Sequence, residues 1–312
     1  MNIQQFQYVL AVVDFKNFEA AAEKCFVTQS TLSTMIGRLE NEIGIKIFNR
    51  KTKPVSVTAE GEEIIKRLRI LANEVDALNN LVQELKGEMI GELKIGVIPT
   101  VAPYLLPLFL TNFAKIFPKV KIIVREMTTT EIQKAINVRT IDVGILALPL
   151  EDPNLNEIPL YSEPFVLYDC SGEAKTEQIS VSDLDYSKLC LLQEGHCLRT
   201  QVQRICDLTD QCANKEENFE FESGSMDSLL RITKARKGIT ILPYLATLDL
   251  TEDIKSKIIE FNDPIPVRNI GLVTHKFFVK KKLLEKLKTL IQESVVDFLP
   301  DNQENYKILK PL

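Results

Sequence analysis

A heptad repeat of apolar residues between positions 59 and 86 constrains the fold of this 312-residue chain more than any other feature. The apolar side chains recur at alternating steps of four and three residues, the pattern of a helix with one continuous apolar seam. Such a helix packs on its own domain or, as we expect because it follows a small N-terminal region, on a second copy of the chain. Gly87 and Gly91 then predict a hinge. The seam comprises Ile64, Leu68, Leu71, Val75, Leu78, Val82 and Leu85.

The first 58 residues predict a small helical domain that binds DNA. Apolar residues recur at helical spacing from Phe6 to Val13, residues 18–24 favour a second helix, and Thr28 is a good N-cap for a third. The third helix carries hydroxyl and amide groups on its outer face, which suit base edges and phosphates in the major groove. Three small helices without a nucleic-acid role remain the alternative. The candidate contacts here are Thr28, Gln29, Ser30, Thr31, Ser33, Thr34 and Arg38.

A short two-stranded wing is predicted at residues 47–58. Arg50, Lys51 and Lys53 gather at its tip, where basic side chains can touch backbone phosphates. Residues 1–58 contain seven Lys and Arg against five Asp and Glu, a net charge of +2. Because the whole chain has a net charge of -5, the remaining residues carry -7. The basic excess therefore lies in the region that we expect to meet DNA.

These N-terminal motifs resemble those of the LysR-type transcriptional regulators. The resemblance implies a winged helix-turn-helix domain at 1–58, a linker and dimerisation helix at 59–88 and an effector domain at 89–312. It also implies a double-stranded DNA operator, a dimer formed through the linker helix and assembled into a homotetramer, and RNA polymerase as a partner. Gly37 departs from the pattern, because many members have arginine or another long polar residue there. The resemblance lies in residues 18–22, Val27-Thr28-Gln29-Ser30-Thr31-Leu32-Ser33, and residues 39–44, 47–50 and 57–61.

Beyond residue 89, strand patterns alternate with helix patterns, which predicts a parallel, doubly wound α/β sheet. Two lobes result, lobe I at 89–163 and 267–300 and lobe II at 164–266, with a cleft between them. The LysR resemblance implies the same build, because the family's effector domains resemble periplasmic binding proteins. We assign no structure to the polar tail at 301–312. The expected strands are 93–99, 120–126, 143–148, 165–168, 188–192, 219–222, 238–242 and 268–273, and the expected helices are 103–117, 130–138 and 281–298.

Two cysteines, Cys197 and Cys206, lie nine residues apart inside this effector region. If the segment between them is helical, their Cα atoms are about 13 Å apart. A disulfide needs Cα atoms within about 7 Å, so helix and disulfide exclude each other. The six cysteines of the chain include no CxxC pair, which argues against a secreted disulfide framework.

The surroundings of this pair resemble the redox centre of the OxyR-type peroxide sensors within the LysR family. The resemblance implies that Cys197 is the peroxidatic cysteine, that Cys206 is the resolving one, and that hydrogen peroxide is the signal. It also places Thr100, Thr129 and Arg268 around the thiol. Attack on peroxide requires a thiolate, which a helix N-terminus and the neighbouring His196 and Arg199 would favour. The matching residues are Gly195-His196-Cys197-Leu198-Arg199, Cys206 and Thr100-Val101-Ala102-Pro103-Tyr104-Leu105-Leu106-Pro107.

One position departs from the peroxide-sensor pattern. Leu230 stands where the resemblance leads us to expect a second arginine. Arg231 is adjacent, but one residue along a helix corresponds to about 100° of rotation. Either Arg231 therefore acts on the thiol from a different direction, or the site lacks the contribution of a second arginine.

We therefore expect a transcription activator that responds to hydrogen peroxide through a reversible Cys197–Cys206 disulfide, which refolds the intervening segment. One alternative is a regulator of the same build that senses a small metabolite in the interlobe cleft. Another is an enzyme, a thiol peroxidase that uses Cys197, although we find no Gly-rich phosphate loop or other catalytic constellation. We expect no enzyme activity.

We expect neither a cofactor nor a metal. A metal site built from Cys190, His196, Cys197, Cys206 and Cys212 is disfavoured, because these residues lack the close pairs typical of zinc ligands. The chain shows no basic and apolar leader pattern and no run of about 18 apolar residues. We therefore expect a cytoplasmic protein with no membrane partner.

Overall fold

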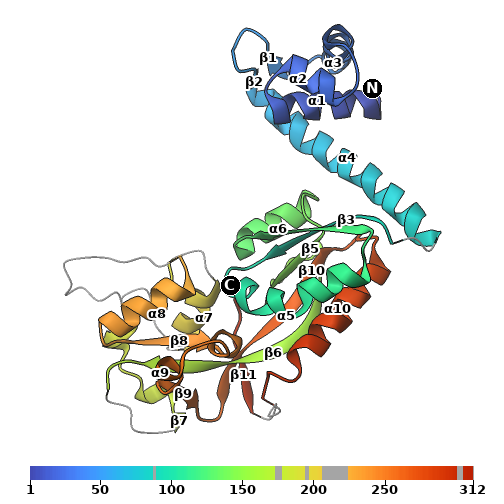
Figure 1. Cartoon of the computed structure of the whole chain (residues 1–312). Coiled ribbons are helices and arrows are strands. Elements are labelled where there is room, and N and C mark those ends of the chain that lie inside the picture. The colour runs from blue at the N-terminus through green and yellow to red at the C-terminus, as the bar shows by residue number, and fades with distance from the viewer. Residues whose placement is uncertain (87–88, 173–177, 194–196, 206–223, 301–304, 312) are drawn as a thin grey trace. The chain divides into compact units, whose positions relative to one another are not determined.

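The computed structural model describes the chain except for residues 87–88, 173–177, 194–196, 206–223, 301–304 and 312 (Figure 1). It divides into two compact units, one made of Met1–Lys86 with Val138–Thr140 and the other of the remaining residues. Among the described residues, no helix is both long enough and apolar enough to cross a membrane.

Three short helices form the first unit's core, as predicted. Each begins at a residue whose side chain caps it: Asn2 accepts a hydrogen bond from the Gln5 amide, Asn17 from Glu19, and Thr28 from Thr31. The predicted N-cap at Thr28 is confirmed. Their apolar faces meet in one core, in which Ala21 and Ala22 are small enough for close helix packing. The helices are α1 (Ile3–Phe15), α2 (Phe18–Lys24) and α3 (Gln29–Ile43).

The wing is confirmed as a two-stranded antiparallel hairpin. β1 (Phe48–Asn49) pairs with β2 (Ser56–Val57), and the exposed Lys51 and Lys53 lie in the turn between them. The buried carboxylate of Glu40, on α3, accepts hydrogen bonds from the amides of Ile47 and Phe48 at 2.8 and 3.2 Å. The start of the wing is thereby attached to α3.

The heptad repeat forms one helix, α4 (Ala59–Leu85), within a residue of its predicted end. Its first turns belong to the first unit's core, where Ile65 and Leu68 are buried. Further along, the seam lies open: Leu71, Leu78 and Leu85 are 47%, 61% and 78% exposed. Part of the seam therefore stabilises its own domain, and the rest is available to another surface.

In the second unit, the strands of lobe I follow the prediction closely. β3 (Gly91–Val97) lies between β4 (Val120–Glu126) and β5 (Val143–Leu148), and all three are parallel. Because the chain crosses from β3 to β4 and then back past β3 to β5, right-handed crossovers place the two connecting helices on opposite faces. The helices of this lobe are α5 (Ala102–Ile116), α6 (Thr129–Asn137) and the closing α10 (Lys281–Val295).

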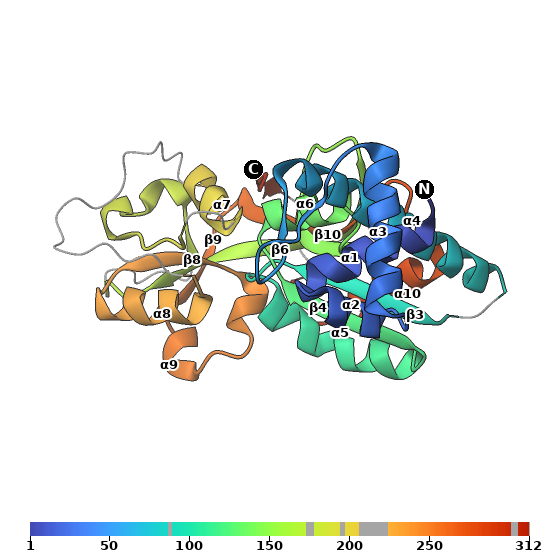
Figure 2. The ribbon, with the colours of Figure 1, turned by 90° about the horizontal axis from the view of Figure 1, so that it is seen from above.

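The predicted parallel arrangement holds for β3, β4 and β5 but not for the strands that join the lobes. β10 (Ile265–His275) runs antiparallel to both β5 and β6 (Leu155–Asp169), because β6 and β10 are long strands that pass between the lobes in opposite directions (Figure 2). The strand expected at 165–168 lies within the second half of β6. The two lobes are therefore joined by a continuous ladder, with Arg268 paired in register with Glu163.

Lobe II is built on the second half of β6, which pairs with β8 (Ile239–Pro243) and β9 (Ile258–Phe261). The strand expected at 188–192 was wrong, because a capped 3-10 turn ends at Lys188 and the described residues after it form only isolated bridges, at Leu189, which pairs with Ile239, and at Leu192. The strand expected at 219–222 lies outside the described residues. The remaining elements are β7 (Gln178–Ile179), α7 (Cys197–Ile205), α8 (Met226–Ala235), α9 (Glu252–Lys255) and the 3-10 turns η1 (Val181–Asp183), η2 (Tyr186–Lys188) and η3 (Tyr244–Thr247).

The C-terminal tail, to which we assigned no structure, contains a strand. β11 (Tyr306–Ile308) pairs parallel with Ile265–Val267 of β10, and Leu309 beyond it is buried. The tail is therefore part of the sheet in the region where β10 leaves lobe II. Arg268 is the next residue of β10 after this ladder.

Candidate redox site and nucleic-acid interface

Cys197 is the first residue of α7 and lies at the junction of the two lobes. Its side chain is 4% exposed and packs in the apolar core of lobe I, whereas Leu198 and Val202 of the same helix pack in the core of lobe II. Its thiol forms no disulfide with another described cysteine. The helix extends to Ile205, the residue before Cys206, and Cys206 itself lies outside the described residues.

Three side chains predicted to surround the thiol are buried in the same part of the molecule. Thr100 follows β3, Thr129 is the first residue of α6, and Arg268 lies on β10; each is at most 2% exposed. Arg268 donates through Nη1 to the Thr100 hydroxyl and through Nη2 to the Thr100 carbonyl, both at 3.1 Å. Arg268 and Thr129 both act on the Cys197 thiol.

Burial raises the pKa of the Cys197 thiol and is the dominant influence on it. The Arg268 charge, the Thr129 hydroxyl and the backbone amides of Leu198 and Cys197 lower this pKa in part. The Thr129 hydroxyl lies near enough to the Cys197 sulfur to lower its pKa, although the distance and angle do not meet the usual hydrogen-bond criteria. Burial of the site therefore favours the neutral thiol over the thiolate.

We expected Arg199 and His196 to favour the thiolate of Cys197. Arg199 donates through Nη1 to the Leu192 carbonyl at 2.8 Å, so it attaches α7 to the segment before it. His196 lies outside the described residues.

A carboxylate that the sequence did not single out completes the buried network. Glu163 Oε2 accepts a hydrogen bond from Arg268 Nε at 2.8 Å and forms an ion pair with Nη2 at 2.8 Å, and its Oε1 accepts from the Leu245 amide at 2.8 Å. Both side chains are at most 1% exposed. Glu163 therefore neutralises much of the charge that Arg268 would otherwise offer to the thiol. The sequence did contain a sign that this carboxylate is buried, because Glu163 directly precedes the apolar run from Pro164 to Leu167.

The structure places Leu230, where we expected a second arginine, at the core of lobe II. Leu230 packs half-buried against the core of lobe II. The neighbouring Arg231 is 78% exposed and pairs with Asp227 at 2.8 Å on the surface of α8. Arg231 therefore does not take the place of the missing arginine.

Of the five residues considered for a metal site, His196, Cys206 and Cys212 lie outside the described residues. Of the other two, Cys190 packs in the core of lobe II and Cys197 in that of lobe I. In the part of the chain that the structure describes, no three His, Cys, Asp or Glu side chains gather as metal ligands would.

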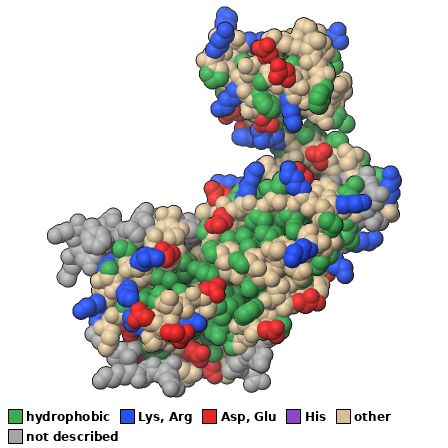
Figure 3. Space-filling view, in the orientation of Figure 1, with side chains coloured by type: hydrophobic (Ala, Val, Ile, Leu, Met, Phe, Trp, Pro, Cys, Tyr) green, Lys and Arg blue, Asp and Glu red, His purple; other side chains and the backbone are tan. Residues whose placement is uncertain are grey.

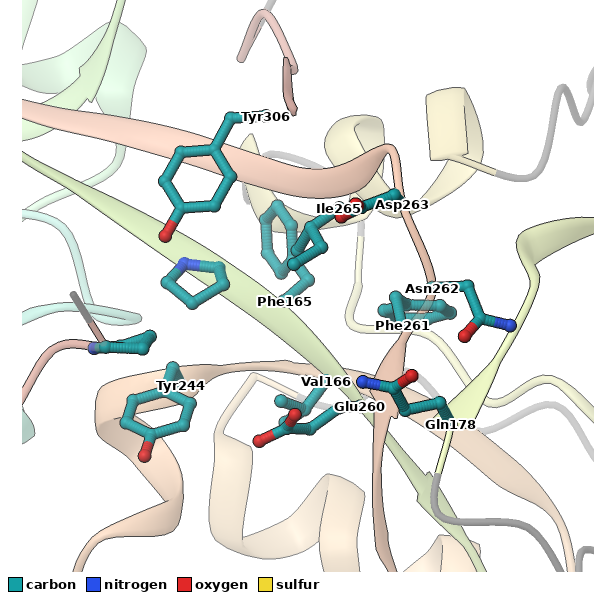
Figure 4. Close-up of a pocket in the computed structure, with 12 residues that line it drawn as sticks. Phe165, Val166, Gln178, Tyr244, Glu260, Phe261, Asn262, Asp263, Ile265 and Tyr306 are labelled. Carbon is teal, nitrogen blue, oxygen red and sulfur yellow. The ribbon is translucent and has the colours of Figure 1, made fainter. Parts of the chain in front are cut away.

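A pocket of about 500 Å³ lies on the lobe II side of β6 and β10 (Figure 4). Phe165, Phe261, Tyr244 and Tyr306 line it with aromatic rings, and Glu260 adds a carboxylate. Its lining includes none of the side chains that surround the Cys197 thiol. A ligand held there would therefore not contact the redox site.

The predicted DNA-contacting residues of α3 lie together on one exposed face. Their side chains point away from the core that Leu32, Ile36 and Leu39 form, because these apolar residues recur at helical spacing on the other face. Ser33 is half-buried and the others are exposed, namely Thr28, Gln29, Ser30, Thr31, Thr34 and Arg38.

The three basic residues of the wing differ in their freedom. Lys51 and Lys53 are exposed at the turn. The Arg50 guanidinium, by contrast, donates to the Ser33 hydroxyl at 2.8 Å, pairs with Glu40 at 3.3 Å and lies 5.1 Å over the ring of Phe18. Arg50 therefore connects the wing to α3. An added Cβ at Gly37 would meet this guanidinium at 3.9 Å, an ordinary contact, so the departure at Gly37 leaves open surface beside Arg50.

Comparisons with known proteins agree with this architecture. Residues 3–62 match the bacterial regulatory helix-turn-helix model of the lysR family, and residues 86–295 match the LysR substrate binding domain. The chain is 32% identical over 301 residues to a hydrogen peroxide-inducible genes activator of Pectobacterium carotovorum, covering 96% of this chain and 98% of that protein. It is 34% identical over 275 residues to the DNA-binding transcriptional dual regulator OxyR of Escherichia coli, covering 88% and 89%.

Solved structures are similar over the same extent. A full-length OxyR variant from Pseudomonas aeruginosa superposes with a TM-score of 0.74 at 27% identity, covering 94% of this chain and 98% of that one. A mutant OxyR from Corynebacterium glutamicum with bound hydrogen peroxide superposes with a TM-score of 0.61 at 26% identity, covering 95% and 93%. The chain therefore belongs to the LysR family of transcription regulators and is similar to the OxyR proteins over nearly its whole length.

Proposed function

We propose that this LysR-family protein is a DNA-binding transcription activator that senses hydrogen peroxide through Cys197 and Cys206. The observation that carries the proposal is the position of Cys197 at the start of α7, buried beside Arg268 and Thr129 in a helix that would have to unwind before Cys206 could reach it. The peroxide-inducible activators among its relatives support this assignment.

The chemistry needs only the two thiols and the peroxide. The Cys197 sulfur, after losing its proton, attacks one peroxide oxygen; the O–O bond breaks, the sulfur becomes a sulfenic acid and the other oxygen leaves as water. The Cys206 thiol then attacks that sulfur, the S–S bond forms and a second water leaves. Peroxide is reduced and the thiol pair is oxidised. The buried Thr129 hydroxyl, which acts on the Cys197 sulfur, can also hydrogen-bond the peroxide inside the site.

Oxidation would change the fold because of the helix between the cysteines. A disulfide requires Cα atoms within about 7 Å, and a helix from Cys197 to Cys206 would hold them about 13 Å apart. Unwinding α7 would withdraw Leu198, Val202 and Ile205 from the core of lobe II. The covalent bond would thus supply the free-energy difference between two conformations that a regulator needs.

The DNA-binding part of the proposal rests on α3 and the wing. The exposed hydroxyl, amide and arginine groups of α3 would read base edges of a double-stranded operator, and Lys51 and Lys53 would contact its phosphates. An activator of this kind would work with RNA polymerase. We place it in the cytoplasm, where thiols are kept reduced until peroxide arrives.

Self-association is the use we propose for the open part of the α4 seam. A dimer joined through α4 would present two copies of α3 to a two-fold operator. A second apolar surface lies on lobe I, where Leu110 and Ala114 of α5 and Ile122 and Val124 of the edge strand β4 line a groove of about 500 Å³. Figure 3 shows apolar side chains gathered on this face. Two separate surfaces would allow dimers to pair into a tetramer.

We propose a regulator, and not a thiol peroxidase, because Cys197 is a buried thiol with a raised pKa in a chain that also carries a helix-turn-helix domain. Turnover separates the two. A sensor consumes about one equivalent of peroxide per subunit and then stops, since only one thiol pair is oxidised. Continued consumption of peroxide in the presence of a reductant would favour the enzyme.

The direct test is to map the thiols by mass spectrometry after peroxide treatment. We expect a Cys197–Cys206 disulfide in the native chain and no peroxide-dependent transcription from Cys197→Ser, with DNA binding retained. Cys190→Ser is the matched control, because Cys190 is also buried but packs in the core of lobe II. Finding both Cys197 and Cys206 free after oxidation would overturn the proposal, and a normal peroxide response in Cys197→Ser would redirect it to the aromatic pocket beside β6.

A further inference from the structure

We infer that the C-terminal tail acts as a latch on α7, so that residues 306–311 determine how easily the helix between Cys197 and Cys206 opens. The tail would thereby set the peroxide sensitivity of the disulfide. The inference rests on the proposed function for its consequence, but the latch itself is a contact that can be tested in the reduced protein alone.

The tail is anchored to the strand that carries Arg268. β11 pairs with residues Ile265–Val267, and the ladder is closed at both ends by hydrogen bonds from the Ile265 amide to the Asn305 carbonyl at 3.1 Å and from the Leu309 amide to the Val267 carbonyl at 2.9 Å. This pairing holds Leu309 and Lys310 at a fixed position on β10. The tail can therefore transmit a restraint from the sheet to whatever it contacts next.

What the tail contacts next is α7. The Gln201 amide nitrogen donates to the Leu309 carbonyl at 3.1 Å, and Arg204 donates through Nη1 to the Lys310 carbonyl at 3.0 Å. The Leu309 side chain packs in the core that Leu198 and Val202 of α7 also enter. Gln201 is in the middle of α7 and Arg204 one residue before its end, so the contacts cover the segment that a disulfide would have to unwind.

The Gln201 contact is the stronger part of the latch. Gln201 is 0% exposed, whereas the Arg204–Lys310 contact is exposed to solvent. A buried amide without its acceptor bears the full cost of desolvation, so the bond to Leu309 favours the helical form of α7 strongly. The Gln201 carbonyl oxygen already has no partner among the described groups, which leaves the Leu309 carbonyl as the interaction that satisfies this side chain.

The direction of the effect follows from which state the latch favours. Contacts made only by helical α7 stabilise the dithiol form and oppose the disulfide, and stabilising the reduced form makes a thiol pair harder to oxidise. Removing the latch should therefore speed disulfide formation and lower the reduction potential of the pair. Removal of one to two net hydrogen bonds corresponds to a shift of roughly fivefold to thirtyfold in the dithiol–disulfide equilibrium.

The first arm of the experiment measures hydrogen exchange of the α7 amides in the full, reduced protein. We would compare the native chain with Gln201→Leu, which removes the donor at similar size, and with a chain ending at Asn305. Lys307→Ala is the matched control, since Lys307 is an exposed residue of β11 and its backbone pairing is retained. Faster α7 exchange in Gln201→Leu and in the shortened chain, with Lys307→Ala unchanged, is the expected result. Native-like protection of α7 in Gln201→Leu would overturn the latch, and this variant decides the matter if the shortened chain does not fold.

The second arm measures the rate of Cys197–Cys206 disulfide formation at fixed peroxide and the disulfide fraction in thiol redox buffers. Both should rise in the latch variants relative to the native chain and Lys307→Ala. Unchanged values beside faster helix exchange would refute the regulatory role of the latch. If no disulfide forms in the native chain, the proposed function fails, while the exchange arm still reports on the latch.

Discussion

Two buried glutamates in this protein hold an arginine in similar ways but in different surroundings. In the DNA-binding unit, Glu40 accepts two backbone amides and pairs with Arg50, which is 40% exposed in its side chain. In the redox site, Glu163 accepts one backbone amide and pairs with Arg268, which is 1% exposed. The first arrangement connects a wing to α3 at the surface, and the second fixes a cation beside a thiol inside the molecule.

The difference shows how burial changes the role of an ion pair. Arg50 remains in contact with solvent, so its pairing contributes little free energy and its purpose is to orient the wing. Arg268 has no access to water, so its charge must be compensated within the protein. Glu163 provides that compensation, and it also weakens the effect of Arg268 on the Cys197 pKa, which burial keeps above its usual range.

The largest expected effect comes from breaking the buried pair. Glu163→Leu leaves Arg268 charged and unpaired in the interior and should lower the free energy of unfolding by about 3–5 kcal/mol, as measured by urea denaturation. The double variant Glu163→Leu with Arg268→Met should recover most of this stability, because both charges are then gone. A decrease below about 1 kcal/mol in the single variant would mean that Arg268 finds water or another partner.

The pH dependence of the thiol tests how far Glu163 restrains Arg268. Because the pKa of Cys197 is raised, the thiol is mainly protonated near neutrality, and its reaction rate with peroxide should rise about tenfold per pH unit below that pKa. Glu163→Gln, which removes the compensating charge, should lower the pKa of Cys197 and increase the rate at neutral pH. Stopped-flow measurements across roughly pH 6 to 9 provide the profile.

A pH-independent rate in the native protein would contradict the raised pKa. Cys197→Ser is the control for reaction at other thiols. An unchanged pH–rate profile in Glu163→Gln would show that neutralising Glu163 does not increase the effect of the Arg268 charge on the pKa of Cys197.

The smallest effects are expected at the wing. The double variant Lys51→Ala with Lys53→Ala should reduce the salt slope of DNA binding by about two, roughly one for each phosphate that the wing no longer touches. Arg50→Leu should change the slope less, because its guanidinium is held by Ser33 and Glu40, and should cost about 0–1 kcal/mol of stability. Binding titrations from low to moderate salt measure both, and a larger slope change for Arg50→Leu would show that Arg50 leaves its partners to contact phosphate.

Local patterns predicted the elements whose residues carry their own signals. The N-cap at Thr28, the helix ending at Leu85 and the parallel strands at Val120–Glu126 and Val143–Leu148 all follow from capping, heptad spacing and short apolar runs. The strand expected at 188–192 failed because an apolar run alone does not show how many of its residues will pair with a neighbouring strand, and here Leu189 makes only an isolated bridge to β8. The antiparallel direction of β10 was missed for the same reason, since strand direction depends on distant connections.

For the candidate redox site, the sequence suggested side chains but not their partners. Thr100, Thr129, Cys197 and Arg268 were named from resemblance, and the structure places all of them in the buried region at the junction of the lobes. Glu163 was missed, because it lies 105 residues before Arg268 and only the β6–β10 ladder pairs them. Arg199 was expected to act on the thiol, yet its guanidinium is held by the Leu192 carbonyl.

The sequence by itself determined the two-part organisation, the helix-turn-helix with its wing, and a cysteine pair whose spacing sets a helix against a disulfide. These features depend on neighbours within a few residues or on spacing along one element. Only the tertiary structure decided that Arg268 is compensated by Glu163, that burial raises the pKa of the Cys197 thiol, and that the tail bonds to α7 through Gln201. Those outcomes depend on desolvation and on pairings between residues more than 100 positions apart, which no local pattern records.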